Sequence, residues 1–127
     1  MPKRLDRQLT DLELELMQLV WRLGECTIRD VYEALPQGRD LAYTTVATMI
    51  KILEQKGAVT CQKKDRAITV KPRIERSQYE SASLRHLNER VFQGDATTMV
   101  TRLLDESELT VEELKSLRKL LDERLRS

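Results

Sequence analysis

The chain has 127 residues, of which 34% are charged and only 4% aromatic, and its formal net charge at pH 7 is +1. This length allows one domain of ordinary size, or a small one with an extension. No apolar run approaches the ~18 residues of a membrane-spanning helix, and the start MPKRLDRQLT lacks the apolar core of a signal peptide, so we expect a cytoplasmic protein.

The first predicted helix begins after Thr10. Thr10 with Glu13 three residues later is the capping-box pattern, and the apolar residues between 12 and 23 form one stripe that ends at a glycine. Trp21 lies off this stripe, so we expect the helix to pack between two elements with Trp21 in the core. Residues 2–8 are either a basic arm near phosphates or a solvated tail.

Two further helices are predicted, separated by a turn that contains Arg39. The first covers residues 27–35 and is capped by Thr27. The second covers residues 42–57 and, at about 100° per residue, has one apolar face and one face that is small, hydroxyl-bearing and basic. A helix that only covers a core usually carries mixed Glu and Lys on its outer face, so this face suits a groove lined by phosphates. Gly57 has the position of a left-handed cap.

Two short strands are predicted next, over residues 59–64 and 67–72, joined through Asp65 and Arg66. Helix, turn, amphipathic helix and basic hairpin in this order are typical of a winged helix-turn-helix. The pattern fits equally well a small α/β module whose helix faces water or a protein partner. Residues 1–73 carry a net charge of +3 and residues 74–127 a net charge of −2, so the positive charge is local.

The side chains expected to contact DNA come from the polar helix face, the preceding turn and the hairpin tip. Small hydroxyl residues near a helix N-terminus fit phosphate contacts and thymine methyl groups, and basic hairpin tips hold phosphates without reading sequence. Simple solvation is an equal alternative for Arg39. The predicted set is Arg39, Tyr43, Thr44, Thr45, Thr48, Lys51, Lys63, Lys64 and Arg66.

Three more helices are predicted after Pro72, over residues 75–93, 95–105 and 111–126. About 50 residues in three helices make a poor independent core, so we expect a second copy of the chain to cover their apolar stripes. Folding back onto the N-terminal domain is the alternative. The side chains expected to close the dimer are Leu87, Val91, Met99, Val100, Leu103, Leu114, Leu117, Leu121 and Leu125.

No combination of residues indicates catalysis, a cofactor or a metal site. His86 is the single histidine, and the sequence lacks a phosphate-binding glycine loop and a GxSxG motif. Cys26 and Cys61 form no CxxC pair, so buried thiols are expected, with a redox role as the less favoured alternative. A short strand over residues 26–28 would bring the two thiols within one or two strands of each other.

The chain contains three blocks that together resemble the penicillinase repressor family (BlaI, MecI and CopY): LTDLELELMQLVW, YTTVATMIKILEQKGAV and GDATTMVTRLLDESELTVEELKSLRKLLDE. The resemblance implies a cytoplasmic homodimeric repressor, mainly α-helical with a small β-hairpin. Its winged helix-turn-helix (residues 1–73) would bind double-stranded DNA at an operator inverted repeat, and its C-terminal helical domain (residues 74–127) would hold the dimer.

The resemblance also implies routes of induction. In the β-lactam-responsive members a membrane-bound sensor metalloprotease leads to cleavage at an Asn-Phe bond just after a Met-Val pair. Here Met99 and Val100 are followed by Thr101, and Arg102-Leu103 occupies the place of that bond. The copper-responsive branch has a cysteine-rich tail, whereas this chain ends in LDERLRS, so copper sensing by that route is not expected.

Three functions are therefore weighed. The favoured one is a non-enzymatic repressor that needs no cofactor and is released by a signal the sequence does not identify, with proteolysis as one route. The alternatives are a winged-helix adaptor for protein interactions and a thiol- or metal-responsive regulator.

Overall fold

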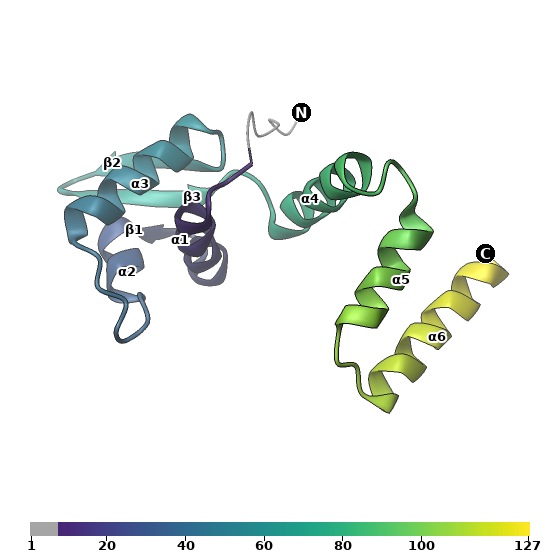
Figure 1. Cartoon of the computed structure of the whole chain (residues 1–127). Helices are drawn as coiled ribbons and strands as arrows, with labels where there is room; N and C mark the ends of the chain where they lie inside the picture. The colour runs from purple at the N-terminus through teal and green to yellow at the C-terminus, as the bar shows by residue number, and fades with distance from the viewer. Residues whose placement is uncertain (1–7) are drawn as a thin grey trace. The chain divides into compact units, whose positions relative to one another are not determined.

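The structure is a computed structural model that describes residues 8–127 (Figure 1). It divides into two compact units, Met1–Ser83 and Leu84–Ser127. The predicted domain boundary between residues 73 and 74 stays a prediction, and the basic residues of the predicted N-terminal arm, Lys3, Arg4 and Arg7, lie outside the described residues. In the part of the chain that is described, no helix is long and apolar enough to cross a membrane.

The first unit is a winged helix-turn-helix, which confirms the predicted fold class. Its three strands form an antiparallel sheet in the order β1-β3-β2, and three helices pack against it (Figure 1). The elements of this unit are α1 (Asp11–Leu23), β1 (Cys26–Thr27), α2 (Ile28–Glu33), α3 (Tyr43–Gln55), β2 (Val59–Lys64), β3 (Ala67–Pro72) and the first part of α4 (Arg76–Arg90). The second unit contains the rest of α4, α5 (Ala96–Glu106) and α6 (Val111–Arg126).

The helix starts follow the capping residues that the sequence contains. The Thr10 hydroxyl accepts a hydrogen bond from the backbone N–H of Glu13, and the Glu13 carboxylate accepts one from the backbone N–H of Thr10. The same reciprocal pair forms at Thr27 and at Thr110. Each pair satisfies backbone donors that the first turn of a helix leaves without intrahelical partners.

Helix α3 ends in a Schellman motif at Gly57. The backbone N–H of Gly57 donates to the carbonyl of Glu54, and that of Ala58 donates to the carbonyl of Leu53. Gly57 has φ of 87°, a left-handed conformation that a glycine adopts without a Cβ clash. The motif turns the chain directly into β2, and so fixes α3 relative to the hairpin.

The core of the first unit lies between α1, α2, α3 and the sheet. The predicted inner face of α3 is confirmed, because Val46, Ile50 and Leu53 are completely buried. Trp21 packs against this core, and its indole Nε1 donates to the carbonyl of Ile74 at 2.9 Å. The other completely buried large side chains are Leu16, Met17, Val20, Val31, Val59 and Val70.

The helices of the second unit leave their apolar side chains exposed. Among the described residues, none beyond Ser83 is buried. Leu103 and Leu121 are each 63% exposed, and Leu125 is 84% exposed. The bounds of these helices were predicted correctly to within a few residues. Within one chain, however, most of their apolar side chains remain exposed to solvent.

Candidate nucleic-acid interface

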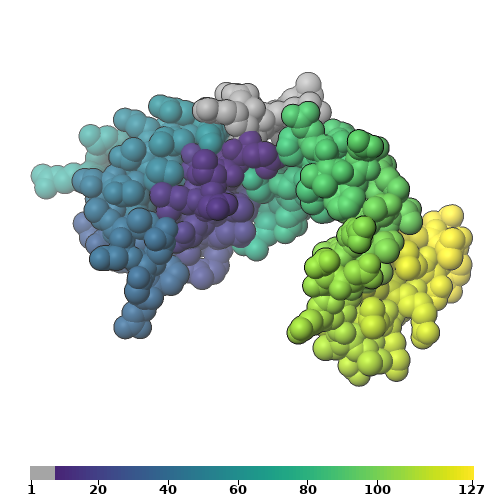
Figure 2. Space-filling view, viewed as in Figure 1, coloured from purple at the N-terminus to yellow at the C-terminus, as the bar shows by residue number. Residues whose placement is uncertain are grey.

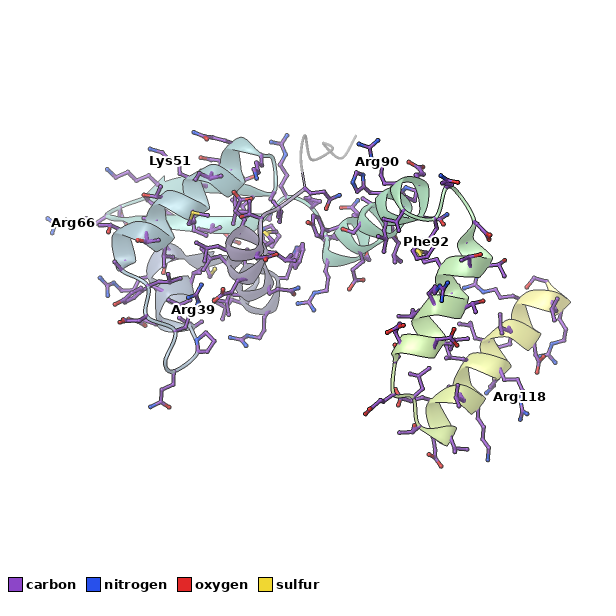
Figure 3. All side chains as sticks on the ribbon, in the orientation of Figure 1. Arg39, Lys51, Arg66, Arg90, Phe92 and Arg118 are labelled. Carbon is purple, nitrogen blue, oxygen red and sulfur yellow. The ribbon has the colours of Figure 1, made fainter. Side chains whose placement is uncertain are left out.

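The outer face of α3 is open and carries three of the predicted contact residues. Thr44, Thr48 and Lys51 are exposed, and Figure 3 shows Lys51 on the side of α3 away from the core. Thr44, Thr45 and Thr48 line a shallow depression together with Met49. This surface combines hydroxyl groups, methyl groups and one cation, which are the groups that contact phosphates and thymine methyls in a major groove.

The start of α3 provides backbone donors as well. Its N-cap residue is Ala42, which makes no side-chain capping hydrogen bond, and no acidic residue occupies the first turn. The amides of this turn therefore keep their capacity to bind an anion, and the helix dipole favours one there. The nearest acidic residue on α3 is Glu54, whose carboxylate accepts a hydrogen bond from the Cys61 backbone N–H at 3.0 Å.

The β2–β3 hairpin carries the predicted wing cations at its tip. Lys63, Lys64 and Arg66 are all exposed, and the strands pair in register from Val59 opposite Pro72 to Lys64 opposite Ala67. The tip projects from the surface of the first unit, where it appears in teal in Figure 2, and Figure 3 shows Arg66 at its end. Cations on such a projection are placed to reach a phosphate backbone.

Arg39 has a partner within the chain. Its Nε and Nη2 donate to the two carboxylate oxygens of Glu15 at 2.7 and 3.1 Å. These hydrogen bonds raise the pKa of Arg39 above its ordinary value. Its charge is thus already neutralised by a bidentate pair, and a contact to phosphate would have to compete with Glu15. The predicted role of Arg39 in DNA binding stays a prediction.

Lys56 does not belong to the interface, although it contributes to the positive charge of residues 1–73. It is 7% exposed, and its Nζ donates to the carboxylate of Glu13, which is 4% exposed. Burial alone would raise the pKa of Glu13, but the hydrogen bonds from Lys56 and Thr10 lower it on balance. The pair joins the start of α1 to the end of α3, so Lys56 fixes α3 against α1 and is not available to phosphates.

Tyr43 lies at the start of α3 in a small aromatic cluster. It is 38% exposed, and its ring meets the ring of Tyr32 edge-on with the centroids 5.5 Å apart. The guanidinium carbon of Arg29 lies 5.1 Å from the centroid of the Tyr43 ring. Sequence reasoning missed Arg29, because no local pattern shows that residues of α2 and α3 meet here.

The two cysteines lie on either side of the central strand of the sheet. The predicted strand near Cys26 is present as β1, and both Cys26 and Cys61 pair with Val70 of β3. Two strand spacings put them roughly 10 Å apart, which is too far for a disulfide. Burial raises the pKa of both thiols, that of Cys61 to about 11. Both thiols are therefore protonated near neutral pH, which favours buried thiols over redox centres. Within residues 8–127, no three His, Cys, Asp or Glu side chains are grouped to hold a metal ion.

The predicted dimerisation residues all lie in helices of the second unit or in the turn after α4. Arg102 and Leu103 lie within the continuous helix α5 and are exposed, so a protease would have to unwind that helix to cleave between them. Met99 is half-buried. The other predicted dimerisation residues are exposed, namely Leu87, Val91, Val100, Leu103, Leu114, Leu117, Leu121 and Leu125.

Comparison with known proteins places this arrangement in a family. The family model described as Penicillinase repressor matches residues 9–123. The penicillinase repressor of Bacillus licheniformis is 28% identical over 116 residues, covering 91% of each chain. The transcriptional regulator BlaI of Mycobacterium tuberculosis is 46% identical over 61 residues, or 47% of this chain and 44% of that protein. The solution structure of the DNA binding domain of the repressor BlaI matches with a TM-score of 0.51 and 30% identity, covering 57% of this chain and 88% of that chain.

Proposed function

Because this chain belongs to the penicillinase repressor family, a family of transcriptional repressors and not of enzymes, we propose that it represses transcription by binding an operator inverted repeat as a homodimer. The observation that carries the proposal is the outer face of α3, which is open, has no acidic residue in the first helical turn, and is accompanied by a basic hairpin. The proposal places the protein in the cytoplasm, where it has access to DNA.

In the proposed complex α3 enters the major groove. Thr44, Thr48 and Lys51 face base edges and phosphates, and the backbone amides at the start of the helix bind a phosphate. The hairpin cations hold the backbone next to the groove and add affinity without reading sequence. Few of these side chains make bidentate contacts to bases, so DNA shape contributes part of the specificity.

The homodimer is supported by the uncovered apolar faces of α5 and α6. Leu114, Leu117 and Leu121 recur at helical spacing on α6 and are 39% to 63% exposed. Apolar surface of this extent in a helical pair is stabilised when a second copy covers it. A two-fold dimer presents two α3 helices, which matches the two half-sites of an inverted repeat.

The proposal includes release of the operator by a signal. Cleavage by a membrane-bound sensor metalloprotease is one route that the family resemblance implies, but this chain has Arg102-Leu103 where the β-lactam-responsive members have the cleaved Asn-Phe pair. Since both residues lie inside α5, this helix would have to unwind locally before it could be cleaved. Cleavage would then disrupt a helix that carries part of the proposed dimer surface. Loss of the dimer would then lower the affinity for a two-half-site operator.

The decisive experiment is selection of genomic DNA fragments by the purified protein, followed by a salt titration on the best site. We expect a short inverted repeat bound by two chains, with log affinity falling linearly against log salt. Lys51→Gln and Lys63→Gln should each weaken binding and lower the salt slope by about 0.9 per half-site. Lys115→Gln, which removes an exposed charge of the same type from α6, is the matched control. Affinity that does not change with salt, or no enriched sequence, would refute the proposal and favour a protein partner for α3.

A further inference from the structure

Arg29 is a cation on the surface between α2 and α3, and it is not among the predicted DNA contacts. Arg29 extends from α2 over the ring of Tyr43, the first residue of α3, at 5.1 Å from the centroid. Tyr43 is in turn held edge-on by Tyr32 of α2 at 5.5 Å. The stack fixes the guanidinium beside the start of α3 and leaves the Arg29 side chain 64% exposed.

The charge of Arg29 is only weakly satisfied within the chain. Among residues 8–127, the carboxylate that pairs with it is that of Glu33 one turn away, at 3.9 Å, and the Glu33 side chain is 62% exposed. An exposed pair at this distance contributes little, because water screens it. Arg39 shows the contrast, since its two short hydrogen bonds to Glu15 occupy the fork of its guanidinium.

We propose that Arg29 binds a backbone phosphate of the operator, with Tyr43 as the residue that positions it. The inference rests on the proposed function. In helix-turn-helix proteins the helix before the recognition helix crosses the DNA backbone, and Arg29 lies on that helix beside the start of the recognition helix. A guanidinium offers planar donors that match two phosphate oxygens, and stacking on an aromatic ring limits the rotamers that binding would otherwise have to restrict.

The position also separates two kinds of contact. Thr44 and Thr48 lie on the outer face of α3, which faces the groove, whereas Tyr43 lies on the flank of α3 next to α2. Arg29 would bind a DNA phosphate on that flank, while the hairpin cations contact the DNA backbone at another position. Arg29 therefore sets the position of α3 in the groove without reading a base.

The test compares Arg29→Gln with Arg126→Gln, which removes the same charge from an exposed position of α6 away from its leucine stripe. Binding of the selected inverted-repeat duplex is measured by fluorescence anisotropy across a salt series. We expect Arg29→Gln to weaken binding about tenfold at low salt and to reduce the salt slope by about 0.9 per half-site, with Arg126→Gln close to wild type. Thermal melting of each variant is the check that the fold is kept, and we expect melting temperatures close to that of the wild type.

Two further variants test the positioning. Glu33→Gln removes the carboxylate that competes for Arg29. As a single substitution it should raise the affinity for the duplex, whereas in a protein that also carries Arg29→Gln it should change the affinity little. In a Tyr43→Ala protein, the loss of DNA affinity caused by Arg29→Gln should be smaller than in the wild type. In a Tyr43→Phe protein, which keeps the aromatic ring under Arg29, that loss should be as large as in the wild type. Equal affinity and salt slope for Arg29→Gln and Arg126→Gln would overturn the inference. Wild-type protein that selects no DNA would instead overturn the proposed function.

Discussion

The two units of this chain are built from similar helices but differ in what covers them. Helices α1 and α6 both begin with a Thr and Glu capping box and both carry an apolar stripe. The stripe of α1 is buried within its own unit, whereas every residue of α6 is exposed. Apolar periodicity thus predicts that a helix has a partner surface, but it does not tell whether that surface belongs to the same chain.

This difference has a thermodynamic consequence. The stability of the first unit comes from contacts within one chain and is independent of protein concentration. The stability of the second unit, if a second copy covers it, increases with protein concentration. Variants in the two units should therefore respond differently to dilution, and the predictions below test this difference.

The largest effect is expected from removing one member of the buried ion pair in the first unit. Glu13→Ala leaves the charge of Lys56 buried without its partner and should lower the free energy of unfolding by about 3–5 kcal/mol. Glu15→Ala, on the same helix, breaks the exposed pair with Arg39 and should cost much less, because water screens that pair. Urea unfolding followed by circular dichroism measures both. An equal decrease in the free energy of unfolding for the two variants would show that burial does not make the Glu13–Lys56 pair more important for stability than the exposed pair.

Matched apolar truncations compare the two units directly. Ile50→Ala removes a completely buried side chain and should destabilise the first unit by about 2–5 kcal/mol at every protein concentration. Leu121→Ala should have almost no effect on a dilute monomer but should raise the dissociation constant of the dimer. Urea unfolding at two concentrations and sedimentation equilibrium distinguish these outcomes. An effect of Leu121→Ala that is unchanged on dilution would favour folding of the helices onto their own chain.

The two capping-box glutamates give the expected pH dependence. The pKa of Glu13 is lowered by its hydrogen bonds with Lys56 and Thr10 against the opposing effect of burial, and that of Glu113 is lowered by hydrogen bonds with Thr110. A carboxyl group with a lowered pKa stabilises the fold above its unfolded pKa and loses this contribution as the pH falls through its folded pKa. Stability should therefore decrease on acidification below the ordinary range of a glutamate.

Glu13→Gln and Glu113→Gln separate the two contributions. Glutamine retains the hydrogen bond of the capping box but does not titrate. Glu13→Gln should flatten the acid limb of unfolding of the first unit, and Glu113→Gln, whose side chain is exposed, should change the pH dependence only slightly. An acid limb that is identical in wild type and Glu13→Gln would assign the pH dependence to other groups.

Most of the fold could be predicted from the sequence, because its signals are local. The caps at Thr10, Thr27 and Thr110, the turn at Gly57 and the hairpin around Asp65 each specify their own geometry within a few residues. These signals fixed the order of the elements and the polar face of α3.

Contacts between distant residues were not predictable in this way. The pair of Lys56 with Glu13 joins residues 43 apart in sequence, and the Arg29–Tyr43 contact joins two helices across a turn. A count of charges along the chain treats Lys56, Arg39 and Arg29 alike. In the structure Lys56 is buried against Glu13, Arg39 donates two short hydrogen bonds to Glu15, and Arg29 is exposed with only a distant pair to Glu33. Three-dimensional packing therefore decides how strongly each cation is already paired within the chain.

The smallest effects are expected at two non-glycine residues with positive φ, one in each unit. Asp65 at the hairpin tip has φ of 58°, and Gln93 after α4 has φ of 52°. Aspartate tolerates this conformation better than glutamine, because its short polar side chain bonds locally. Gln93→Gly should therefore stabilise by about 0.5–1 kcal/mol, and Asp65→Gly by less. The gain from Gln93→Gly should appear in the concentration-dependent transition and that from Asp65→Gly in the concentration-independent one. Both gains in one transition would mean that the two units unfold together.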